Sequence, residues 1–386
     1  MHARPVAHLN YTRVVRVRQA GGAVIETPTR IHAVPVTGIG EIQPGDRLDQ
    51  ALLPALRAAG VETGDVLCIS TKIVSKSLGL VTSPELRERA VEESSVRIVA
   101  RRLHTHRVTT IAQIPSGPVM AAAGVDSSNA PGGPLLLPPD PDACAAELRT
   151  ALQDALGLRL AVVLTDTSSR VWRVGVGDIA LGAAGLRSLQ DLRGSVDGSG
   201  RSLSVTVRTL ADEIAAAADL VKGKSERVPL ALVRGLAEHV VDGDVQVPAA
   251  ALSRTGGEDW FRRPSLESVW QAMGVPADRE PIARMSPEPA DERIARALAV
   301  ALIDRTEAPP TDEDAPAPQG QGPGSPTARA RLVGPRRIEV HPAGDGPQHW
   351  LAAGALAERI RTALGAEAIA APLPYVQIHI TPETAP

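Results

Sequence analysis

LRLAVVLTDTSSR, at residues 158–170, is the stretch that decides the fold, because an apolar run ends there in acidic and hydroxyl side chains. A short run rich in β-branched residues predicts a buried strand over Leu158–Thr165, with Asp166 following at its end. The same pattern recurs in PVMAAAGVDSSN at residues 118–129. The two stretches together predict a sheet that presents polar side chains where strands end.

Helical signals surround these strands. Asp140 and Pro141 form an N-cap and a first helical position, and Gly157 closes the same helix. Leucines at helical spacing predict a helix over Gly45–Ala59. Because several strands follow one another without a crossover helix, we expect an α+β fold rather than a doubly wound sheet. The other expected strands are Asp65–Ser70, Arg107–Gln113, Pro118–Ala123, Leu203–Val207 and Val228–Val233, and the other expected helices are Thr209–Val221, Ser265–Met273, Ala290–Asp304 and Trp350–Leu364.

Composition narrows the class of protein. Hydrophobic residues make up 43% of the 386 residues, enough for a sizeable core, whereas aromatic residues make up 2% and offer few platforms for stacking. The net charge of −3 argues against a nucleic-acid binder. No apolar run is long enough to span a bilayer and no signal peptide is recognisable, so we expect a cytoplasmic protein with free thiols at Cys68 and Cys144.

The chain length predicts more than one domain. We expect a leader at residues 1–30, a catalytic domain at 31–255, a helical extension at 256–307 and a small C-terminal segment at 329–386. Residues 308–328 are dense in Pro, Gly and acidic residues, which is typical of a disordered linker.

Asp126, Asp166 and Thr167 are candidate metal ligands. Carboxylates and hydroxyls at facing strand ends suit Mg²⁺ or Mn²⁺, which fill the rest of their coordination shell with phosphate oxygens and water. Taken singly, each aspartate is equally compatible with a turn or a cap. Two other patterns predict nothing: the glycines of 175–180 lie too far from the preceding strand for a dinucleotide fingerprint, and Gly223-Lys224-Ser225 follows a helix, unlike a Walker A loop.

Several motifs in a fixed order resemble one family. The chain is similar to the F420-0:γ-glutamyl ligase family over Ile31–Leu252, and in particular to the N-terminal ligase domain of its actinobacterial two-domain form. The motifs that carry the resemblance are TGIGEI (37–42), GDVLCISTKIVSKSLG (64–79), AAAGVDSSN (121–129), LLPPDPDA (136–143), TDTSSRVWRVGVGDIALG (165–182), DLRG (191–194) and ADEIAAAADLVKGKSERVPLALVRG (211–235).

The resemblance implies mixed, largely antiparallel sheets with flanking helices, and a cytoplasmic homodimer that acts on small molecules and binds neither nucleic acid nor membrane. It implies a GTP-dependent ligase that activates the phospholactyl carboxylate of F420-0 as an acyl phosphate and joins L-glutamate to it. Mg²⁺ or Mn²⁺ would bind Asp126, Asp166 and Thr167, with K⁺ as a further candidate ion. The nucleotide contacts that it implies are Ile39, Gly40, Glu41, Ile42, Thr71, Lys76, Asn129 and the stretch Val221–Arg227, which includes Val221, Lys222, Gly223, Lys224 and Ser225.

Arg170, Arg173 and Asp178 are the candidate catalytic residues of this resemblance. The two arginines would hold the anionic acceptor or the departing phosphate, although arginines after a strand are equally compatible with solvated positions. The small C-terminal segment resembles a degenerate nitroreductase end, and we expect no FMN there.

Two stretches depart from the family pattern. Pro115-Ser116-Gly117 stands where the family usually has Arg-His-Gly, and Val174, Val176 and Gly177 replace polar residues. Two alternatives therefore stay open: the same ligation chemistry on another acid or amine in specialised metabolism, or a catalytically silent binding partner of an F420 ligase.

Overall fold

The computed structural model of the protein describes residues 9–12, 16–18, 24–26, 30–104, 107–171, 173–243, 247–261, 263–276, 279–281, 283, 288–304, 328–369 and 371–382. The chain divides into two compact units, Met1–Ser253 and Arg254–Pro386. The expected linker lies outside the described residues except for Ala328, which is the first residue of a strand.

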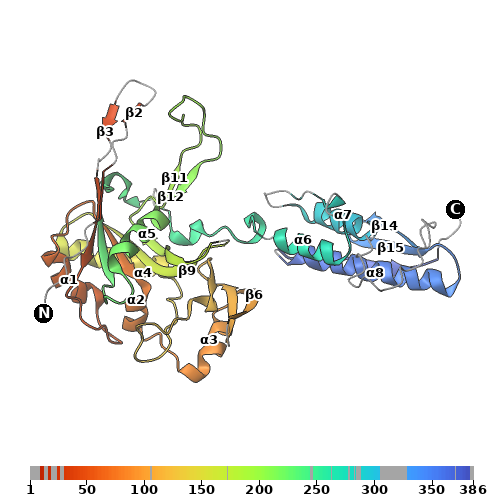
Figure 1. Ribbon diagram of the computed structural model, residues 1–386, viewed down its shortest axis with the longest axis horizontal. Helices are drawn as coiled ribbons and strands as arrows, with labels where there is room; N and C mark the ends of the chain where they lie inside the picture. The colour runs from red at the N-terminus through yellow and green to blue at the C-terminus, as the bar shows by residue number, and fades with distance from the viewer. Residues whose placement is uncertain are drawn as a thin grey trace, which may run out of the picture. The chain divides into compact units, whose positions relative to one another are not determined.

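The first unit holds most of the strands (Figure 1). Its helices are α1 (Leu48–Ala58), α2 (Thr71–Ser77), α3 (Arg87–Glu93), α4 (Pro141–Leu156) and α5 (Leu210–Lys222). Its strands are β1 (Leu9–Thr12), β2 (Arg16–Arg18), β3 (Val24–Glu26), β4 (Arg30–Val36), β5 (Val66–Ser70), β6 (Arg97–His104), β7 (Arg107–Gln113), β8 (Val119–Ala121), β9 (Ala161–Ser169), β10 (Val176–Ala184), β11 (Leu189–Asp191), β12 (Val207–Thr209) and β13 (Leu230–Arg234).

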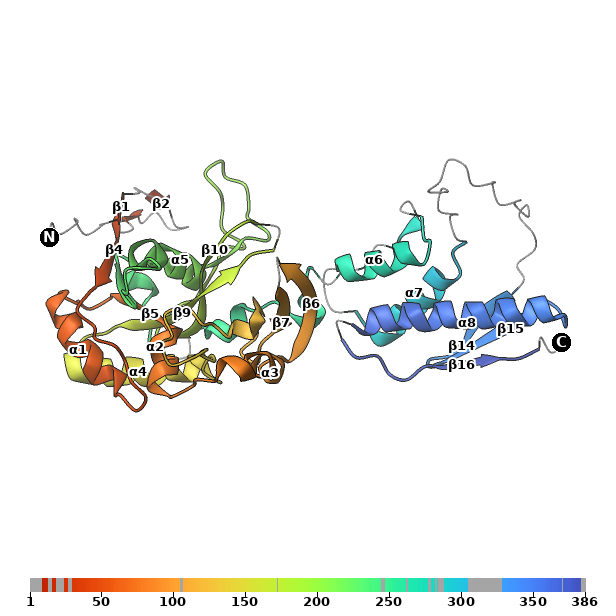
Figure 2. The same ribbon diagram turned by 60° about the horizontal axis from the view of Figure 1, so that its bottom comes forward.

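A six-stranded sheet in the order β1-β4-β13-β5-β9-β10 forms the centre of this unit. Only the β5–β9 pair is parallel, and the other described pairs of the sheet are antiparallel. Figure 2 shows α5 on one face of the sheet and α4 on the other. The expectation of an α+β fold with mixed, largely antiparallel sheets is confirmed.

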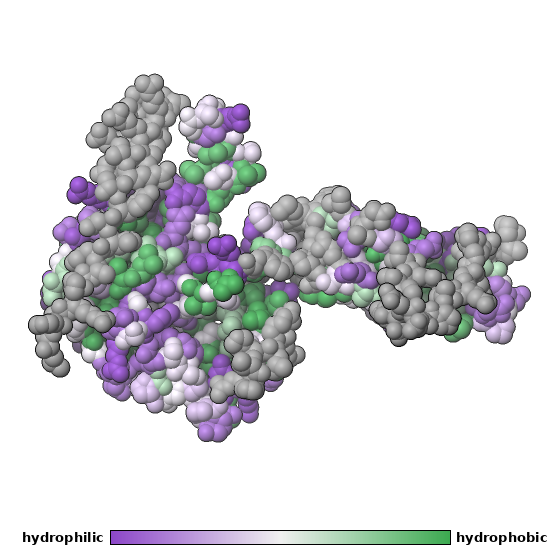
Figure 3. Space-filling view, in the orientation of Figure 1, coloured by the Kyte–Doolittle hydropathy of each residue, from purple (hydrophilic) through white to green (hydrophobic). Residues whose placement is uncertain are grey.

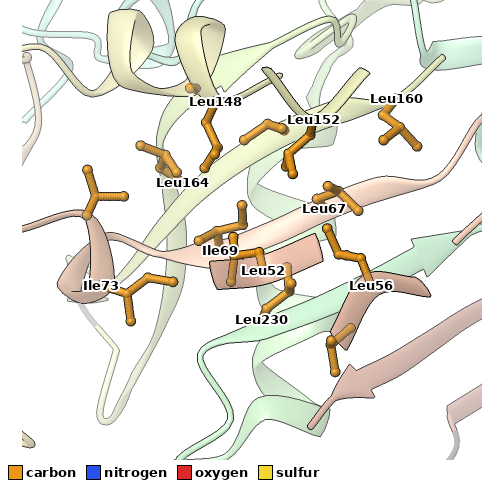
Figure 4. Packing of buried hydrophobic residues seen from close by; sticks show 14 of the residues in the cluster. Leu52, Leu56, Leu67, Ile69, Ile73, Leu148, Leu152, Leu160, Leu164 and Leu230 are labelled. Carbon is orange, nitrogen blue, oxygen red and sulfur yellow. The ribbon is translucent and has the colours of Figure 1, made fainter. Parts of the chain in front are cut away.

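Alternating side chains divide the buried residues into two cores. Leu67 and Ile69 of β5 face the side on which Leu52 of α1 packs (Figure 4). Val66 and Cys68 face the side covered by α5. Since neighbouring strand residues point to opposite faces, β5 must be apolar at every position to be buried on both sides, which explains its continuous apolar run. Fully burying each large side chain contributes about 1.5–3 kcal/mol to stability.

Smaller elements flank the main sheet. A three-stranded sheet, β6-β7-β8, packs with α3 around Val91, Ile114 and Met120. A hairpin of β11 and β12 projects from the unit, and Figure 3 shows apolar surface on it. Val205 in this hairpin is 83% exposed.

The second unit contains α6 (Arg263–Ala272), α7 (Ala290–Ala301), α8 (Pro347–Ala368), β14 (Ala328–Gly334), β15 (Arg337–Pro342) and β16 (Gln377–Ile380). Its sheet has the order β14-β15-β16, with β15 and β16 parallel. The core forms around Trp270, which is 1% exposed, and Ile360 of α8. Arg296 lies between the buried carboxylates of Glu288 and Glu367, each 2.7 Å away.

Several sequence predictions can be compared directly with these elements. Asp140 accepts a hydrogen bond from the Ala143 amide, and Gly157 ends α4 in the left-handed conformation, so the predicted caps are confirmed. The predicted strand at Leu203–Val207 is wrong: β12 begins only at Val207, because the preceding residues have no buried face to pack. Val176 and Gly177 begin strand β10, so the glycines there form no dinucleotide-binding loop.

No helix in the described part of the chain is long and apolar enough to cross a membrane.

Candidate functional site

An open pocket of about 760 Å³ lies where α2, β9, β10 and the C-terminal end of α5 meet. The loop after β4 supplies Ile39–Ile42, and the loop after β8 supplies Ser127 and Asn129. The remaining wall comes from the segment that leads into β13. Elements far apart in the sequence therefore build one concave surface, which is typical of ligand sites.

Pairing between β9 and β10 sets the floor of the pocket. Asp178 lies opposite Thr167 and Ile179 lies opposite Asp166 in an antiparallel register. Asp166 does not end its strand, as the sequence suggests, because β9 continues to Ser169 and the hydroxyl residues pair with β10. The polar half of β9 is thus a regular strand that holds its side chains rigidly.

A buried ion pair joins α5 to this floor. Lys222 Nζ lies 2.6 Å from Asp178 Oδ2, and the two side chains are 4% and 5% exposed. Thr165 and Thr167 also donate hydrogen bonds to the Asp178 carboxylate, at 2.8 and 3.0 Å. Burial acts to raise the pKa of Asp178, but the Lys222 charge and these hydrogen bonds outweigh it and lower the pKa. Asp178 is therefore an ionised anchor whose oxygens are already engaged.

A second lysine holds the other aspartate. Lys72 Nζ lies 2.6 Å from Asp126 Oδ2 and donates to Ser128 Oγ at 2.6 Å. The Ser128 amide donates to Asp126 Oδ1 at 2.7 Å. Burial acts to raise the pKa of Asp126, but Lys72 and Ser128 lower it overall.

Asp166 differs from its neighbours because it has no lysine directly bonded to it among the described residues. It is 6% exposed, and the Thr167 amide donates to its carboxylate at 2.9 Å. Burial raises its pKa to about 6, and the charges of Asp126 and Asp178 act in the same direction. A buried carboxylate close to two others is a position where a cation would be strongly stabilised.

The rim of the pocket is basic. Lys76 pairs with Glu41, and Lys224 donates to Thr167 Oγ1. Asn129 Nδ2 donates to the Lys224 carbonyl at 3.2 Å, which ties the two loops together. Among the described lining residues the cations are Lys72, Lys76, Lys222, Lys224 and Arg227, and the carboxylates are Glu41, Asp166, Asp178 and Asp219.

Gly223 is required where α5 ends. Its φ is +64°, and a Cβ there would lie 2.1 Å from Glu226 Oε2. Only glycine accepts this conformation without strain and without displacing the neighbouring side chain. The turn at Gly223 therefore separates the buried Lys222 from Lys224, which is exposed to the pocket.

The donor set fits a hard divalent cation. Asp126, Asp166 and Thr167 offer only oxygen, which Mg²⁺ and Mn²⁺ prefer, and such ions take few protein ligands when phosphate and water complete the shell. Across the described chain, no group of three His, Cys, Asp or Glu side chains is arranged to hold a metal ion.

Most of the residues suggested by the sequence come together in this pocket. Those among its lining residues are Ile39, Gly40, Glu41, Ile42, Lys76, Asn129, Asp166, Thr167, Asp178, Lys222, Gly223 and Lys224. Asp126 is the neighbour of the lining residue Ser127 and pairs with Lys72, which lines the pocket.

Other suggested residues are not among the lining residues. Thr71 is fully buried and donates to the Thr165 carbonyl at 3.0 Å, so it braces α2 against β9. Val221 packs on the core that α5 covers, and Ser225 hydrogen-bonds Glu226. Arg170 and Arg173 are exposed, and the Arg173 amide donates to the Arg170 carbonyl at 3.2 Å.

Sequence reasoning missed Lys72 as an individual site residue. A lysine near the start of a helix is ordinarily solvated, so nothing local distinguishes Lys72 from a surface residue. Its spacing of four from Lys76 is the available signal, because residues at i and i+4 share one helix face. Asp219 lines the pocket too and was also missed, whereas Arg227, which lines it as well, belongs to the stretch that the resemblance suggested.

Comparison with known proteins covers the whole of this site. The model of the F420-0:Gamma-glutamyl ligase family matches residues 38–235. A protein of Methanopyrus kandleri named Coenzyme F420:L-glutamate ligase is 36% identical over 250 residues, which span 97% of that protein and 60% of this chain. A protein of the same name from Haloarcula marismortui is 33% identical over 261 residues, which span 95% of that protein and 62% of this chain. Another, from Archaeoglobus fulgidus, is 35% identical over 225 residues, which span 88% of that protein and 54% of this chain.

Proposed function

Because the chain belongs to the F420-0:Gamma-glutamyl ligase family, we propose that it is an amide ligase that joins L-glutamate to the phospholactyl carboxylate of F420-0. We further propose that the reaction consumes GTP and requires Mg²⁺ or Mn²⁺. The observation that carries this proposal is the placement of Asp126, Asp166 and Thr167 beside a pocket lined by four lysines and an arginine.

The proposed chemistry has two balanced steps. A carboxylate oxygen of the acid bonds to the γ-phosphorus of GTP, the bond to the β-phosphate oxygen breaks, and GDP leaves. The amine of glutamate then bonds to the acyl carbon of the acyl phosphate, inorganic phosphate leaves, and the nitrogen loses a proton. Negative charge develops on phosphate oxygens in the first step, and on the acyl oxygen and the departing phosphate in the second, so positioning and charge neutralisation carry most of the catalysis.

The basic rim supplies that neutralisation. Lys76 and Lys224 both line the pocket and pair with Glu41 and Thr167, and rotation about their side-chain bonds would turn the ammonium groups toward phosphate oxygens. Asn129, held by the Lys224 carbonyl, is a candidate contact to the nucleotide. Lys222 contributes positive charge from the floor of the pocket, but its hydrogen bond to Asp178 keeps its ammonium group fixed.

Asp178 acts as a positioning residue in this scheme. Its carboxylate aligns Thr165, Thr167 and Lys222 under the cation site, and its lowered pKa makes it a poor proton acceptor. A divalent ion would supply electrostatic stabilisation of the negative charge that develops on phosphate oxygens. Asp126 and Asp166 would hold that ion, with Thr167 as a further oxygen donor.

Product mass spectrometry tests the proposal. Purified protein is incubated with F420-0, L-glutamate, GTP and Mn²⁺, and the product is expected to gain the mass of one glutamyl residue. Omitting GTP, or adding excess EDTA, should abolish the product. Absence of any product with active protein and all four components would overturn the proposal.

One observation favours a changed substrate as the alternative. Val174 in the β9–β10 connection is fully exposed and Val176, the first residue of β10, is 65% exposed, and neither apolar side chain offers a hydrogen bond to an anionic substrate. If GTP is consumed with another acid or amine but not with F420-0 and glutamate, this alternative replaces the proposal. If GTP is never consumed, the silent binding partner replaces both.

A further inference from the structure

A second cavity adjoins the nucleotide pocket. Its volume is about 750 Å³, close to the 760 Å³ of the first. Helix α3, strand β7 and the loop after β8 surround it, with Arg87, Val108 and Ala122 in its wall. None of the suggested nucleotide, metal or catalytic residues is among its described lining residues.

The two cavities share a wall. Ser127, Ala130 and Pro131 line both of them, and Ser127 directly follows the candidate metal ligand Asp126. The two cavities are therefore adjacent along the loop that carries Asp126 and Ser127. Lys76 and Lys224, the proposed phosphate contacts, line the first cavity and are not among the lining residues of the second.

Strained backbone conformations are concentrated around the two cavities. Among the described residues, the non-glycine residues with positive φ are Ala122, Ala123, Asn129 and Arg227. Ala122 lines the second cavity, Asn129 and Arg227 line the first, and Ala123 packs beneath the shared loop. Left-handed backbone costs an L-residue roughly 1–2 kcal/mol and persists mainly where surrounding structure and function require it.

Size and charge indicate what the second cavity holds. Pockets of roughly 300–1,000 Å³ enclose drug-sized molecules, so this cavity is far larger than a free amino acid needs. Arg87 is the cation among its described lining residues, and Glu88, which pairs with it, is 75% exposed and screened by water. Thr109 and Thr110 add hydroxyl groups. A large acid with an anionic group distant from its reacting carboxylate matches this lining.

We infer that the second cavity binds the body of the acid substrate, so that its reacting carboxylate extends past Ser127 to Asp126 and Asp166. This inference rests on the proposed function, and it adds where the acid lies and which residues select it. Arg87 contacts an anionic group of the acid, whereas glutamate enters from elsewhere. Arg87 and Val108 are then specificity residues for the acid alone.

Two variants with matched controls test the inference. Arg87→Ala removes the cation, and Val108→Glu places a negative charge in the cavity wall. Arg89→Ala removes an exposed arginine from the same helix, and Val96→Glu adds a charge at an exposed valine beside β6; neither residue lines the cavity. Binding of F420-0 to the full chain is measured by calorimetry, together with KM values for F420-0, GTP and glutamate.

Losing a charge-assisted hydrogen bond weakens binding by about tenfold to a hundredfold. We expect Arg87→Ala and Val108→Glu to raise the Kd and KM for F420-0 by that factor and to leave the KM values for GTP and glutamate within about twofold. Both controls should match the unaltered protein.

The outcomes separate this inference from the proposed function. If ligation proceeds and both cavity variants bind F420-0 normally, the inference is wrong and the function stands. If the variants weaken F420-0 binding but no glutamyl product forms, the function is wrong and the cavity assignment stands. A raised KM for glutamate or GTP instead of F420-0 also overturns the inference, as does failure of F420-0 to bind the unaltered protein.

Discussion

The ammonium of Lys222 and the carboxylate of Asp178 lie 2.6 Å apart in the interior of the first unit, with 4% and 5% of their side chains exposed. Lys222 is the last residue of α5 and Asp178 is on β10, so the pair fixes the helix end that carries the basic turn against the floor of the site. A buried pair of this kind positions groups more than it stabilises the fold, because desolvation offsets much of the attraction.

Removing one partner of this pair should destabilise the first unit. Lys222→Met removes the buried counterion of Asp178 and leaves only the exposed ammonium of Lys224, 3.9 Å away, so we expect a loss of about 3–5 kcal/mol in the free energy of unfolding. Denaturant-dependent hydrogen exchange of peptides from β9 and β10 measures it. Lys224→Met is the control, because Lys224 is 58% exposed and its loss should cost below about 1 kcal/mol. Equal losses of unfolding free energy in the two variants would contradict the role of Lys222 as the main counterion of Asp178.

The carboxylates proposed to bind the cation should differ from the other carboxylates of the pocket in their effect on Mn²⁺ affinity. Asp126→Asn and Asp166→Asn are each expected to weaken Mn²⁺ binding by more than about tenfold, since each removes a charged oxygen ligand. Electron paramagnetic resonance titration of free Mn²⁺ measures the affinity without relying on activity. Asp219→Asn serves as the control because Asp219 lines the same pocket but is not a proposed ligand. Unchanged Mn²⁺ binding in both ligand variants would exclude the site.

Cys68 should be chemically silent in the folded protein. Burial raises the pKa of its thiol from 9.0 to about 12, so almost no thiolate exists at pH 8. We expect a thiol reagent to modify Cys144, which is less buried, while Cys68 reacts only after unfolding. The raised pKa means that the folded state holds the proton more tightly, so this contribution to stability is lost as pH rises from about 9 to about 12. Cys68→Ala should therefore flatten the alkaline decline in melting temperature, and an unchanged decline would contradict it.

Relieving the strained loop should stabilise the protein. Ala122 has a φ of +51°, and glycine removes a cost of roughly 1–2 kcal/mol while losing about 0.4–1 kcal/mol through greater freedom of the unfolded chain. We expect Ala122→Gly to raise the free energy of unfolding by up to about 1 kcal/mol. Ala121→Gly, at an ordinary φ of −67°, should lower it by roughly 0.5–1 kcal/mol instead. Thermal unfolding distinguishes the two, and a loss in both would show that the strain is absent.

Local chemistry made part of the fold predictable. The Asp140 cap and the Gly157 stop of α4 depend on neighbouring residues only, and the sequence shows both. The strand at Leu203–Val207 was predicted wrongly, since the alternation of its residues matches a strand while Val205 has no partner surface to pack against. Burial is a property of the assembled fold and cannot be found within five residues.

The candidate site was predictable to the extent that its motifs stand in register along the chain. Asp166, Thr167 and the Gly223–Lys224 turn come together as the motifs suggest. The bond between Lys72 and Asp126 could not be predicted, because it depends on how α2 lies beside the loop after β8. Arg170 and Arg173 show the converse, since residues next to a predicted ligand in sequence can still be exposed outside the pocket.

The Lys72–Asp126 bond changes what loading of the site involves. Because the ammonium of Lys72 already balances the charge of Asp126, a divalent ion that bound there would displace this ammonium. It would not enter a site of uncompensated negative charge. Small metal-dependent domains unfold when the ion is removed, because metal binding supplies much of their folding free energy. Here Lys72 balances Asp126 when no ion is bound. Removal of the ion by a chelator should therefore abolish activity and leave the six-stranded sheet folded.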